Sequence, residues 1–336
     1  MTPMWREHAS GVIMRTARKL FANTPVQKMP LTTRIYAKAF RFGSASDEIA
    51  TNFRGVRLIV PSKGTTIVPG LVGGCYQKVE LDVFERLAAI SDTIVDVGAS
   101  IGLYSCIAAD RAAVSATIVA FEPVPENVRY LRRNLEENER TARVLVEEQA
   151  VGQASGKIHI YLAEGSTSAH SPSAKNAHNS TTSLAAPAVS IDGYVRQSLR
   201  NRPIDLLKVD VEGYECAVLR GARRTLREDQ PTLFIRYVPD HLDNCGFRPI
   251  EFLDIVFGIY DNVFLVDEPR ATFKPCSKDD LLRYPGRGYR NVSLIAMSAS
   301  SRPAHHQVIE SARAALHQKR ARHPRLVGLW NTQPRW

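Results

Sequence analysis

Residues 96–102 have the residue types of a turn that brings the backbone close to a bound nucleotide. The apolar run at 93–97 contains Asp96, and the small-residue turn after it has glycines at positions 98 and 102 before helical periodicity begins. A strand, turn and helix in this order form a Rossmann-like nucleotide site. A second apolar run ends in Glu122, about 20 residues further on, where a carboxylate can accept hydrogen bonds from ribose hydroxyls. A ribose-bearing cofactor is therefore the first hypothesis.

Ser100 indicates which cofactor this is. A dinucleotide site needs glycine at this second position so that the backbone can approach the pyrophosphate. No Gly-Lys-Ser or Gly-Lys-Thr sequence follows the turn, which argues against a phosphate-binding P-loop. S-adenosylmethionine has a ribose but no phosphate, so a side chain is tolerated at Ser100 and its hydroxyl can bond the methionine end. The residues favour S-adenosylmethionine over a dinucleotide, and a structural turn without a ligand is the alternative.

A second polar group follows the apolar run at 204–210. Lys208 and Asp210 are two residues apart, so a β-strand places both on one face. They stand at the carboxyl end of the strand, where open α/β sheets bind ligands. Glu212 comes next, and Gly213 permits a turn into a helix. Buried charges are costly unless paired, so these side chains need partners or a ligand.

Methyl transfer to an alcohol requires a group that orients the hydroxyl and accepts its proton. We predict Asp210 as this acid–base or orienting group, with Lys208 and Glu212 positioning it or the acceptor. One alternative is a structural ion pair that fixes the strand to its helix. Another is a hard-cation site formed by Asp210, Glu212 and a third oxygen donor, but we assign no metal ligands.

Four other residues lie near these groups in the sequence. His170 and His178 are isolated histidines in a polar segment, for which simple solvation is the preferred interpretation. Tyr104 and Asn127 begin predicted helices beside the cofactor turn, where packing is as good an explanation as ligand contact.

The composition is that of an ordinary globular protein. The chain has 336 residues, of which 44% are hydrophobic and 23% are charged. It has neither the apolar stretch of a transmembrane helix nor the apolar core of a secretory signal. Its five cysteines include no Cys-x-x-Cys pair, which argues against a disulfide framework or a zinc site. We therefore expect a cytoplasmic protein.

The positive charge is concentrated at the two ends of the chain. The formal net charge is +10, yet the body between residues 47 and 300 has more acidic than basic side chains. This argues against a nucleic-acid partner, which requires a basic binding face. Residues 1–46 are expected to form a basic amphipathic helical extension, suited to peripheral contact with an anionic membrane surface. A helical cap packed on the domain is the preferred alternative.

The remaining chain is predicted to divide into three parts. Residues 47–92 should form a hairpin, with strands at 55–60 and 65–68, and then a helix at 77–90. Residues 93–300 should form an α/β domain, and residues 301–336 a basic tail that is mobile except for a short helix at 306–320. Residues 164–188 lack periodicity and are expected to form a functional loop or a disordered segment.

Strands and helices alternate within residues 93–300. This alternation implies a mostly parallel sheet with helices on both faces, ending in an antiparallel edge pair. The expected strands are 93–97, 117–121, 143–147, 204–210, 232–237, 262–266 and 292–297. The expected helices are 102–111, 126–138, 191–200, 215–227 and 249–258.

These stretches together resemble the FkbM family of S-adenosylmethionine-dependent methyltransferases. The matching runs are 96–105, 121–123, 179–184, 189–192 and 208–215, and their order and spacing cover roughly residues 75–300. The resemblance implies a class I methyltransferase fold, with a mostly parallel seven-stranded sheet and an antiparallel edge strand. It also implies, most often in this family, O-methylation of a sugar or natural-product hydroxyl.

The resemblance also implies roles for individual residues. Cofactor contacts would come from Asp96, Gly98, Ser100, Gly102 and Glu122. Lys208, Asp210 and Glu212 would face the reaction together with Ser183, and we count Ser183 and Tyr104 among the cofactor contacts.

The chain departs from the family pattern at two positions. The family usually has asparagine where this chain has Ser100. It also tends to have glutamate at the end of the fifth strand, where this chain has Arg236. We predict that Arg236 binds an anionic acceptor, such as a phosphate- or carboxylate-bearing glycan, and altered or lost activity is the alternative.

The predicted function is therefore O-methylation of a hydroxyl on a glycan, a lipid-linked saccharide or a related small molecule. One alternative is a non-catalytic module that uses Arg236 and the basic ends to hold an anionic partner. A nucleic-acid methyltransferase is another, and Ser100 argues against a dehydrogenase.

Overall fold

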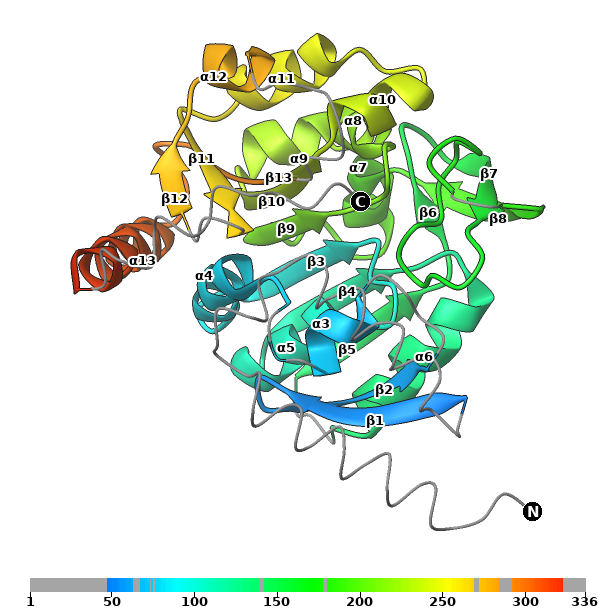
Figure 1. Cartoon of the computed structure of the whole chain (residues 1–336). Helices are drawn as coiled ribbons and strands as arrows, with labels where there is room; N and C mark the ends of the chain where they lie inside the picture. Colours follow the sequence, from blue (N-terminus) through cyan, green and yellow to red (C-terminus); the bar gives the residue numbers. More distant parts are fainter. Residues whose placement is uncertain are drawn as a thin grey trace.

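Figure 1 shows the computed structural model of the chain. The structure describes residues 47–62, 67–72, 74, 76–138, 142–177, 180–268, 272–283 and 292–322. The predicted basic extension at 1–46 lies outside the described residues, as do His178 and Asn179.

The centre of the molecule is an eight-stranded sheet in the order β12-β11-β13-β10-β9-β3-β4-β5. Strands β5, β4, β3, β9 and β10 run parallel. In the register Val97 pairs with both Phe121 and Val209, so the carboxyl ends of β3, β4 and β9 lie side by side. The strands are β3 (Thr93–Val97), β4 (Thr117–Phe121), β5 (Arg143–Glu147), β9 (Leu206–Val209), β10 (Thr232–Tyr237), β11 (Asn262–Asp267), β12 (Thr272–Pro275) and β13 (Val292–Met297).

The sheet differs from the expected one at a single edge. The antiparallel strand β13 lies between β10 and β11, one position further in than the predicted edge. The short strand β12 adds an eighth strand by pairing antiparallel with β11. Its four residues end in Pro275 and are too few to show a period in the sequence. The prediction of a mostly parallel α/β fold of the class I methyltransferase type is confirmed.

Helices cover both faces of the sheet (Figure 1). Side chains alternate along β3, so Ile94 belongs to one buried cluster and Val95 and Val97 to another. The first cluster includes α4 and α5, and the second includes α7, α8, α9 and α11. The helices are α3 (Val68–Val72), α4 (Lys78–Ala88), α5 (Leu103–Arg111), α6 (Pro125–Glu136), α7 (Ile191–Gln197), α8 (Glu215–Gly221), α9 (Arg223–Glu228), α10 (Pro239–Asn244), α11 (Pro249–Phe257), α12 (Lys278–Leu282) and α13 (Pro303–Arg322).

The N-terminal hairpin lies earlier in the chain than predicted. It joins β1 (Glu48–Phe53) to β2 (Val56–Pro61) through Arg54 and Gly55, and α3 begins at Val68, where a strand was expected. Both turn residues have positive φ, at 53° and 88°, which fits the tight hairpin turn of type I′. Arginine is an unusual residue for such a turn, so the turn has little signature in the sequence.

A small second sheet covers one side of the carboxyl edge (Figure 1). It has the order β6-β8-β7 and contains β6 (Ala150–Val151), β7 (Gly156–Leu162) and β8 (Thr182–Val189). The prediction of a structureless segment at 164–188 is therefore wrong for its last third. Strand β8 is rich in alanine and contains Pro187, so it lacks the β-branched residues that mark most strands.

Helix α13 contains the short helix that was predicted at 306–320, and it packs against the domain. Its residues Ile309 and Ala312 are buried in the first cluster. His305 is fully buried, and its ring nitrogens lie 3.2 Å from Ser91 Oγ and 2.8 Å from Thr232 Oγ1. Burial lowers the pKa of His305 to about 4. Among the described helices none is long and apolar enough to cross a membrane.

Candidate active site

A cavity of about 510 Å³ lies at the carboxyl ends of the parallel strands. This is where open α/β sheets bind ligands, and the volume suits a small organic molecule. Eight of the predicted site residues line its wall: Gly98, Ser100, Tyr104, Glu122, Lys208, Asp210, Glu212 and Arg236.

Gly98 lets the turn after β3 approach the end of β9. Its φ is +79°, and a Cβ atom there would overlap the carbonyl oxygen of Asp210. Its N–H and that of Ala99 both donate to the carbonyl of Phe121, at 3.0 Å. Gly102 also has positive φ, but a Cβ there would meet Leu131, and the residue does not line the cavity. Of the two glycines, Gly98 therefore faces the ligand space and Gly102 allows α5 to pack on α6.

Glu122 lies at the end of β4 and faces this turn. One carboxylate oxygen accepts from the Ser100 N–H at 2.8 Å, and the other accepts from Val124 N–H at 3.0 Å and Asn127 Nδ2 at 3.2 Å. Burial raises the pKa of Glu122 to about 7. A carboxylate has about four acceptor positions, so one remains for a ligand hydroxyl. This arrangement fits a ligand that offers a hydroxyl to the carboxylate.

The loop before β8 is tied to the cofactor turn. Ser100 Oγ donates to the Thr167 carbonyl at 2.7 Å, and Asn127 Nδ2 donates to the same oxygen at 2.8 Å. The Ser100 hydroxyl thus donates to the loop and keeps its acceptor positions, so its contact with the methionine end of a cofactor stays a prediction. His170 follows in this loop and lines the cavity, but its Nδ1 accepts from the Ala163 N–H at 3.0 Å. Burial lowers the pKa of His170 to about 4, so it is neutral.

Lys208 pairs with Asp96 and not with Asp210. Its Nζ lies 2.9 Å from Asp96 Oδ1, and the other oxygen of Asp96 accepts from Ser105 Oγ at 2.8 Å. Asp96 is 1% exposed and does not line the cavity. Asp96 therefore lies behind the cavity wall in a buried ion pair between neighbouring strands, and its cofactor contact stays a prediction.

Asp210 pairs instead with Arg236, which lies on the neighbouring strand β10. Arg236 Nη2 donates to Asp210 Oδ2 at 3.0 Å, and its Nη1 donates to Ser293 Oγ at 2.7 Å and lies 3.6 Å from Glu80 Oε2. Burial raises the pKa of Asp210, but the charges of Arg236 and Lys208 outweigh it and hold the pKa below its usual range. Because two carboxylates compensate the guanidinium, the geometry gives no support to the prediction that Arg236 binds an anionic acceptor.

Two further predicted cofactor contacts are Ser183 and Tyr104. Ser183 is an exposed residue of β8 and does not line the cavity. Tyr104 lines the cavity, but its hydroxyl donates to Glu80 Oε1 at 2.8 Å and Lys208 Nζ lies 4.8 Å from its ring centroid. Tyr104 therefore belongs with the charged residues around Arg236.

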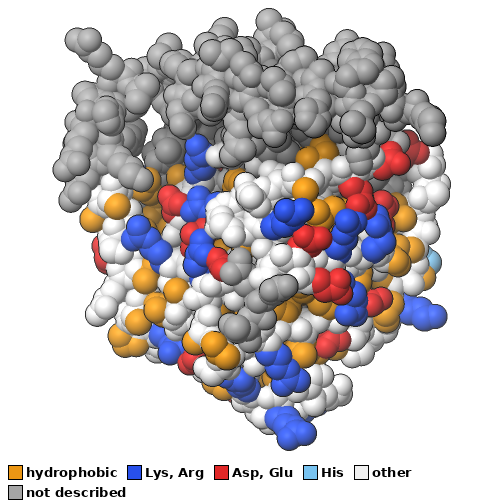
Figure 2. Space-filling view, turned by 90° about the horizontal axis from the view of Figure 1, so that it is seen from below, with side chains coloured by type: hydrophobic (Ala, Val, Ile, Leu, Met, Phe, Trp, Pro, Cys, Tyr) orange, Lys and Arg blue, Asp and Glu red, His pale blue; other side chains and the backbone are white. Residues whose placement is uncertain are grey.

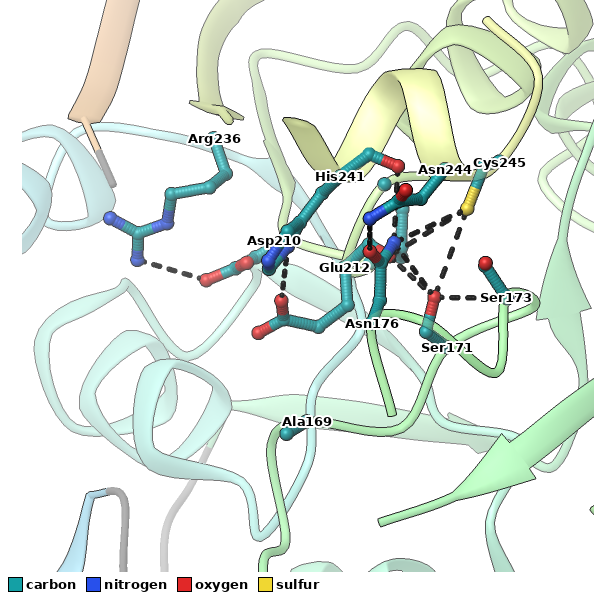
Figure 3. Close-up of polar contacts among 12 residues, drawn as sticks. Ala169, Ser171, Ser173, Asn176, Asp210, Glu212, Arg236, His241, Asn244 and Cys245 are labelled. Atoms are coloured by element: carbon teal, nitrogen blue, oxygen red, sulfur yellow. Dashed lines mark hydrogen bonds and ion pairs between the residues drawn. The ribbon is translucent and has the colours of Figure 1, made fainter. Parts of the chain in front are cut away.

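The sequence analysis missed two residues of the site. Glu80 is 3% exposed and lies on α4, where it contacts Arg236, Tyr104 and Ser293. His241 lies on α10, and its Nδ1 is 3.0 Å from Glu212 Oε2 (Figure 3). Glu80 occupies a buried position of an amphipathic helix, which is a weak signal, and His241 has no signal beyond its helix-starting Pro239. Within the described ranges no three His, Cys, Asp or Glu side chains are grouped to hold a metal ion.

The sheet order and the glycine turn beside the cavity define the class of protein. A parallel sheet with one antiparallel strand next to its last parallel one, and a ligand site at the carboxyl edge, is the class I methyltransferase fold. Residues 96–256 match the family model of the methyltransferase FkbM domain. The chain therefore carries a methyltransferase FkbM domain, and the resemblance seen in the sequence is confirmed.

Three known proteins show how far the similarity extends. The chain is 31% identical over 154 residues to the hexuronic acid methyltransferase AglP of Haloferax volcanii, a match that covers 44% of this chain and 58% of that protein. The structure of methyltransferase FkbM from Methylobacillus flagellatus KT has 16% identity and a TM-score of 0.38, covering 79% of this chain and 59% of that one. The O-methyltransferase TomG from Streptomyces achromogenes has 13% identity and a TM-score of 0.40, covering 66% of this chain and 80% of that one. The chain thus spans little more than half the length of the first two proteins.

Proposed function

We propose that the protein is an S-adenosylmethionine-dependent O-methyltransferase that acts on a hydroxyl of a sugar, a glycan or a related natural product. The observation that carries the proposal is one continuous cavity. It joins the cofactor-type turn of Gly98 and Glu122 to the charged ends of β9 and β10. A methyltransferase needs the methyl donor and the acceptor in contact, and a shared cavity meets this need.

The cofactor would lie in the β3–β4 half of the cavity. Glu122 would accept a ribose hydroxyl, and Gly98 would let the backbone approach the ligand. S-adenosylmethionine supplies an activated methyl group when bound. Ile158 and Ile160 of β7 line the same wall and would shield the cofactor from water.

The acceptor would lie in the β9–β10 half. Lys208, Asp210 and Glu212 line this part of the wall, and hydroxyl methylation needs one group there to take the proton. Asp210 was the predicted base, but its lowered pKa makes it a weak one and suits it to orienting the hydroxyl. The name of the Haloferax relative, a hexuronic acid methyltransferase, supports a sugar acceptor.

The first experiment is calorimetric titration of the full chain with S-adenosylmethionine. Micromolar binding by the wild type is expected, with a loss of roughly tenfold or more in Glu122→Ala because a buried hydrogen bond to the ribose is removed. Glu126→Ala is the matched control, because Glu126 is an exposed residue in the first turn of α6 and its removal should leave binding unchanged. No binding to well-folded wild type would overturn the proposal.

The second experiment tests the acceptor. Neutral methyl glycosides and methyl glycosides of uronic acids are incubated with the protein and S-adenosylmethionine, and a mass increase of one methyl group is sought. Methylation of a neutral sugar or of a uronic acid would support the proposal and separate the two acceptor classes. Cofactor binding without turnover on any member would favour the alternative of a module that binds without catalysis.

Two further expectations from the sequence concern nucleic-acid and membrane partners. On the face shown in Figure 2, the described basic side chains are interspersed with acidic ones, which offers little support for a nucleic-acid methyltransferase. Peripheral membrane contact through residues 1–46 remains a separate proposal within a cytoplasmic setting. Cosedimentation with phosphatidylserine vesicles tests it, and equal recovery with neutral vesicles would contradict it.

A further inference from the structure

Glu212 and His241 form a buried pair beside the cavity (Figure 3). His241 Nδ1 lies 3.0 Å from Glu212 Oε2, and the two side chains are 12% and 20% exposed. Glu212 lines the main cavity, and His241 lines a second hollow of about 360 Å³. Each cavity therefore has one member of the pair in its wall.

The backbone around this pair is closely fixed. Glu212 has a left-handed conformation with φ of 49°, and a Cβ on Gly213 would overlap the His241 carbonyl oxygen. Asn176 Nδ2 donates to the carbonyls of both Glu212 and His241, each at 3.0 Å. Ser171 Oγ donates to the Glu212 carbonyl at 2.7 Å. A left-handed conformation in a residue other than glycine is costly and persists only where the surroundings fix it, most often at functional sites.

The partner of Glu212 differs from the partners of the nearby carboxylates. Asp210 and Glu80 contact Arg236, which stays charged at all ordinary pH values. Asp96 contacts Lys208. Glu212 contacts a histidine, and histidine is the side chain whose charge changes near neutral pH. Of these four carboxylates, Glu212 is thus the one whose ion-pair partner can gain or lose its charge near neutral pH.

We propose that His241 is a positioning residue for the methyl transfer, which orients the Glu212 carboxylate toward the acceptor hydroxyl and controls when this carboxylate accepts the proton. The inference rests on the proposed O-methyltransferase function and assigns the proton acceptor to Glu212 rather than Asp210.

The chemistry balances with one proton. As the bond from the acceptor oxygen to the methyl carbon forms, the bond from that carbon to sulfur breaks and its electron pair stays on sulfur. The hydroxyl proton passes to Glu212, which releases it to solvent after the product leaves. Neutral His241 leaves Glu212 basic, whereas a protonated His241 stabilises the carboxylate charge and weakens the base.

The charged groups around His241 determine when it titrates. Burial lowers the pKa of His241, but Glu212 in the loop after β9, Glu215 of α8 and Asp240 of α10 together raise it above the ordinary value of 6.5. Asp210 is also close enough to interact electrostatically. Lys175 and Asp243 line the hollow on its other side. The rate of methyl transfer should therefore rise with pH through a value above 6.5.

The first test is an NMR titration that needs no acceptor. The protein is labelled with ¹³C-histidine, and the His241 signal is assigned by its absence in His241→Asn. We expect His241 to titrate above 6.5 in the wild type and below 6.5 in Glu212→Gln, where burial dominates, both with and without S-adenosylmethionine. An unchanged titration in Glu212→Gln would overturn the proposal.

The second test compares kcat with the affinity for the cofactor, using the methyl glycoside that is methylated in the acceptor panel. His241→Ala should lower kcat roughly 10–100-fold and leave S-adenosylmethionine binding unchanged. His241→Asn keeps an N–H donor without a titrating ring, so it should recover most of kcat and lose the rise with pH. The control is His159→Gln, because His159 is an exposed residue of β7 and should behave as the wild type.

The outcomes separate this proposal from the proposed function. Wild-type protein that does not bind S-adenosylmethionine contradicts the function, whatever the titration shows. If the cofactor binds but no glycoside is methylated, the alternative of a module that binds without catalysis is favoured, and the NMR titration alone decides whether the pair exists. A His241→Ala protein with the kcat and pH profile of the wild type would overturn the role of His241.

Discussion

The two halves of the cavity lie side by side on one sheet edge but are built in different ways. In the β3–β4 half, the groups that face the ligand are fixed by backbone N–H bonds, such as those from Ser100 and Val124 to Glu122. In the β9–β10 half, they are charged side chains that pair with one another, as Arg236 does with Asp210. The first half is fixed by local chain geometry and the second by contacts between distant segments.

In the β3–β4 half, called here the backbone-held half, ligand binding and stability depend on different groups. In the β9–β10 half, called the paired half, the same charged side chains contribute to both. Removing a group from the backbone-held half should mainly weaken ligand binding, because it leaves no buried charge without an ion-pair partner. Removing one charge from the paired half leaves its partner buried and uncompensated, which destabilises the fold. Four changes test this contrast.

The largest effect is expected for Lys208→Met. It leaves Asp96, which is 1% exposed, without its ion-pair partner, and should lower the free energy of unfolding by about 3–5 kcal/mol. Urea unfolding measures the change. The double variant with Asp96→Asn should recover part of the loss, because the uncompensated charge is gone. A loss below about 1 kcal/mol, the usual value for an exposed pair, would contradict the contrast, because removing a charge from the paired half would then not destabilise the fold strongly.

Gly98→Ala should have the next largest effect. The left-handed φ and the overlap with the Asp210 carbonyl oxygen together should cost about 2–4 kcal/mol in urea unfolding. Gly246→Ala is the matched control, since Gly246 has φ of +83° but a Cβ there would meet nothing within 4 Å. That variant should lose only about 1 kcal/mol. Equal losses would mean that backbone strain alone, and not the close approach of β3 to β9, requires glycine at position 98.

The pH dependence of cofactor binding tests the backbone-held half alone, through the ionisation of Glu122. Burial raises the pKa of Glu122 to about 7, and a ribose hydroxyl is best accepted by the ionised form. S-adenosylmethionine should therefore bind about tenfold more weakly at pH 6 than at pH 8. Calorimetry at both pH values tests this, and Glu122→Gln should bind weakly without the pH dependence. The same dependence in Glu122→Gln would assign the titration to another group.

The smallest effect is expected for Ser293→Ala in the paired half. Ser293 Oγ accepts from Arg236 and donates to Glu80, but these two charges still contact each other without it. The free energy of unfolding should fall by about 1 kcal/mol, the usual net value of one hydrogen bond. A loss as large as that of Lys208→Met would show that the hydroxyl, and not the ion pair, holds the network together.

The same contrast explains what could be predicted from the sequence. The strands at 93–97, 117–121, 232–237 and 292–297 were predicted with their observed bounds, because buried strands are nearly continuous apolar runs. The Gly98 turn and Glu122 were predicted for a similar reason, since their spacing along the chain is itself the signal. Local patterns were therefore enough to predict the sheet and the backbone-held half of the site.

The paired half could not be predicted in the same way. Arg236 contacts Glu80, which lies far earlier in the chain, and two helices and a strand separate Glu212 from His241 along the chain. No local sequence pattern shows which charged side chains form an ion pair. Lys208 was therefore predicted to position Asp210 or the acceptor, whereas it pairs with Asp96. Strand β8 was missed because alanine and proline are not typical strand residues. Its antiparallel pairing with β7 holds it in the sheet.

The position of β13 has a consequence for how the protein is made. This strand is inserted between β10 and β11, yet it is supplied by residues 292–297, after all the other strands of the sheet. During synthesis β10 and β11 therefore leave the ribosome with two unpaired edges facing each other. Open edges invite pairing with other chains. The nascent protein should need protection by chaperones until its last strand emerges, and chains terminated before residue 292 should aggregate rather than fold.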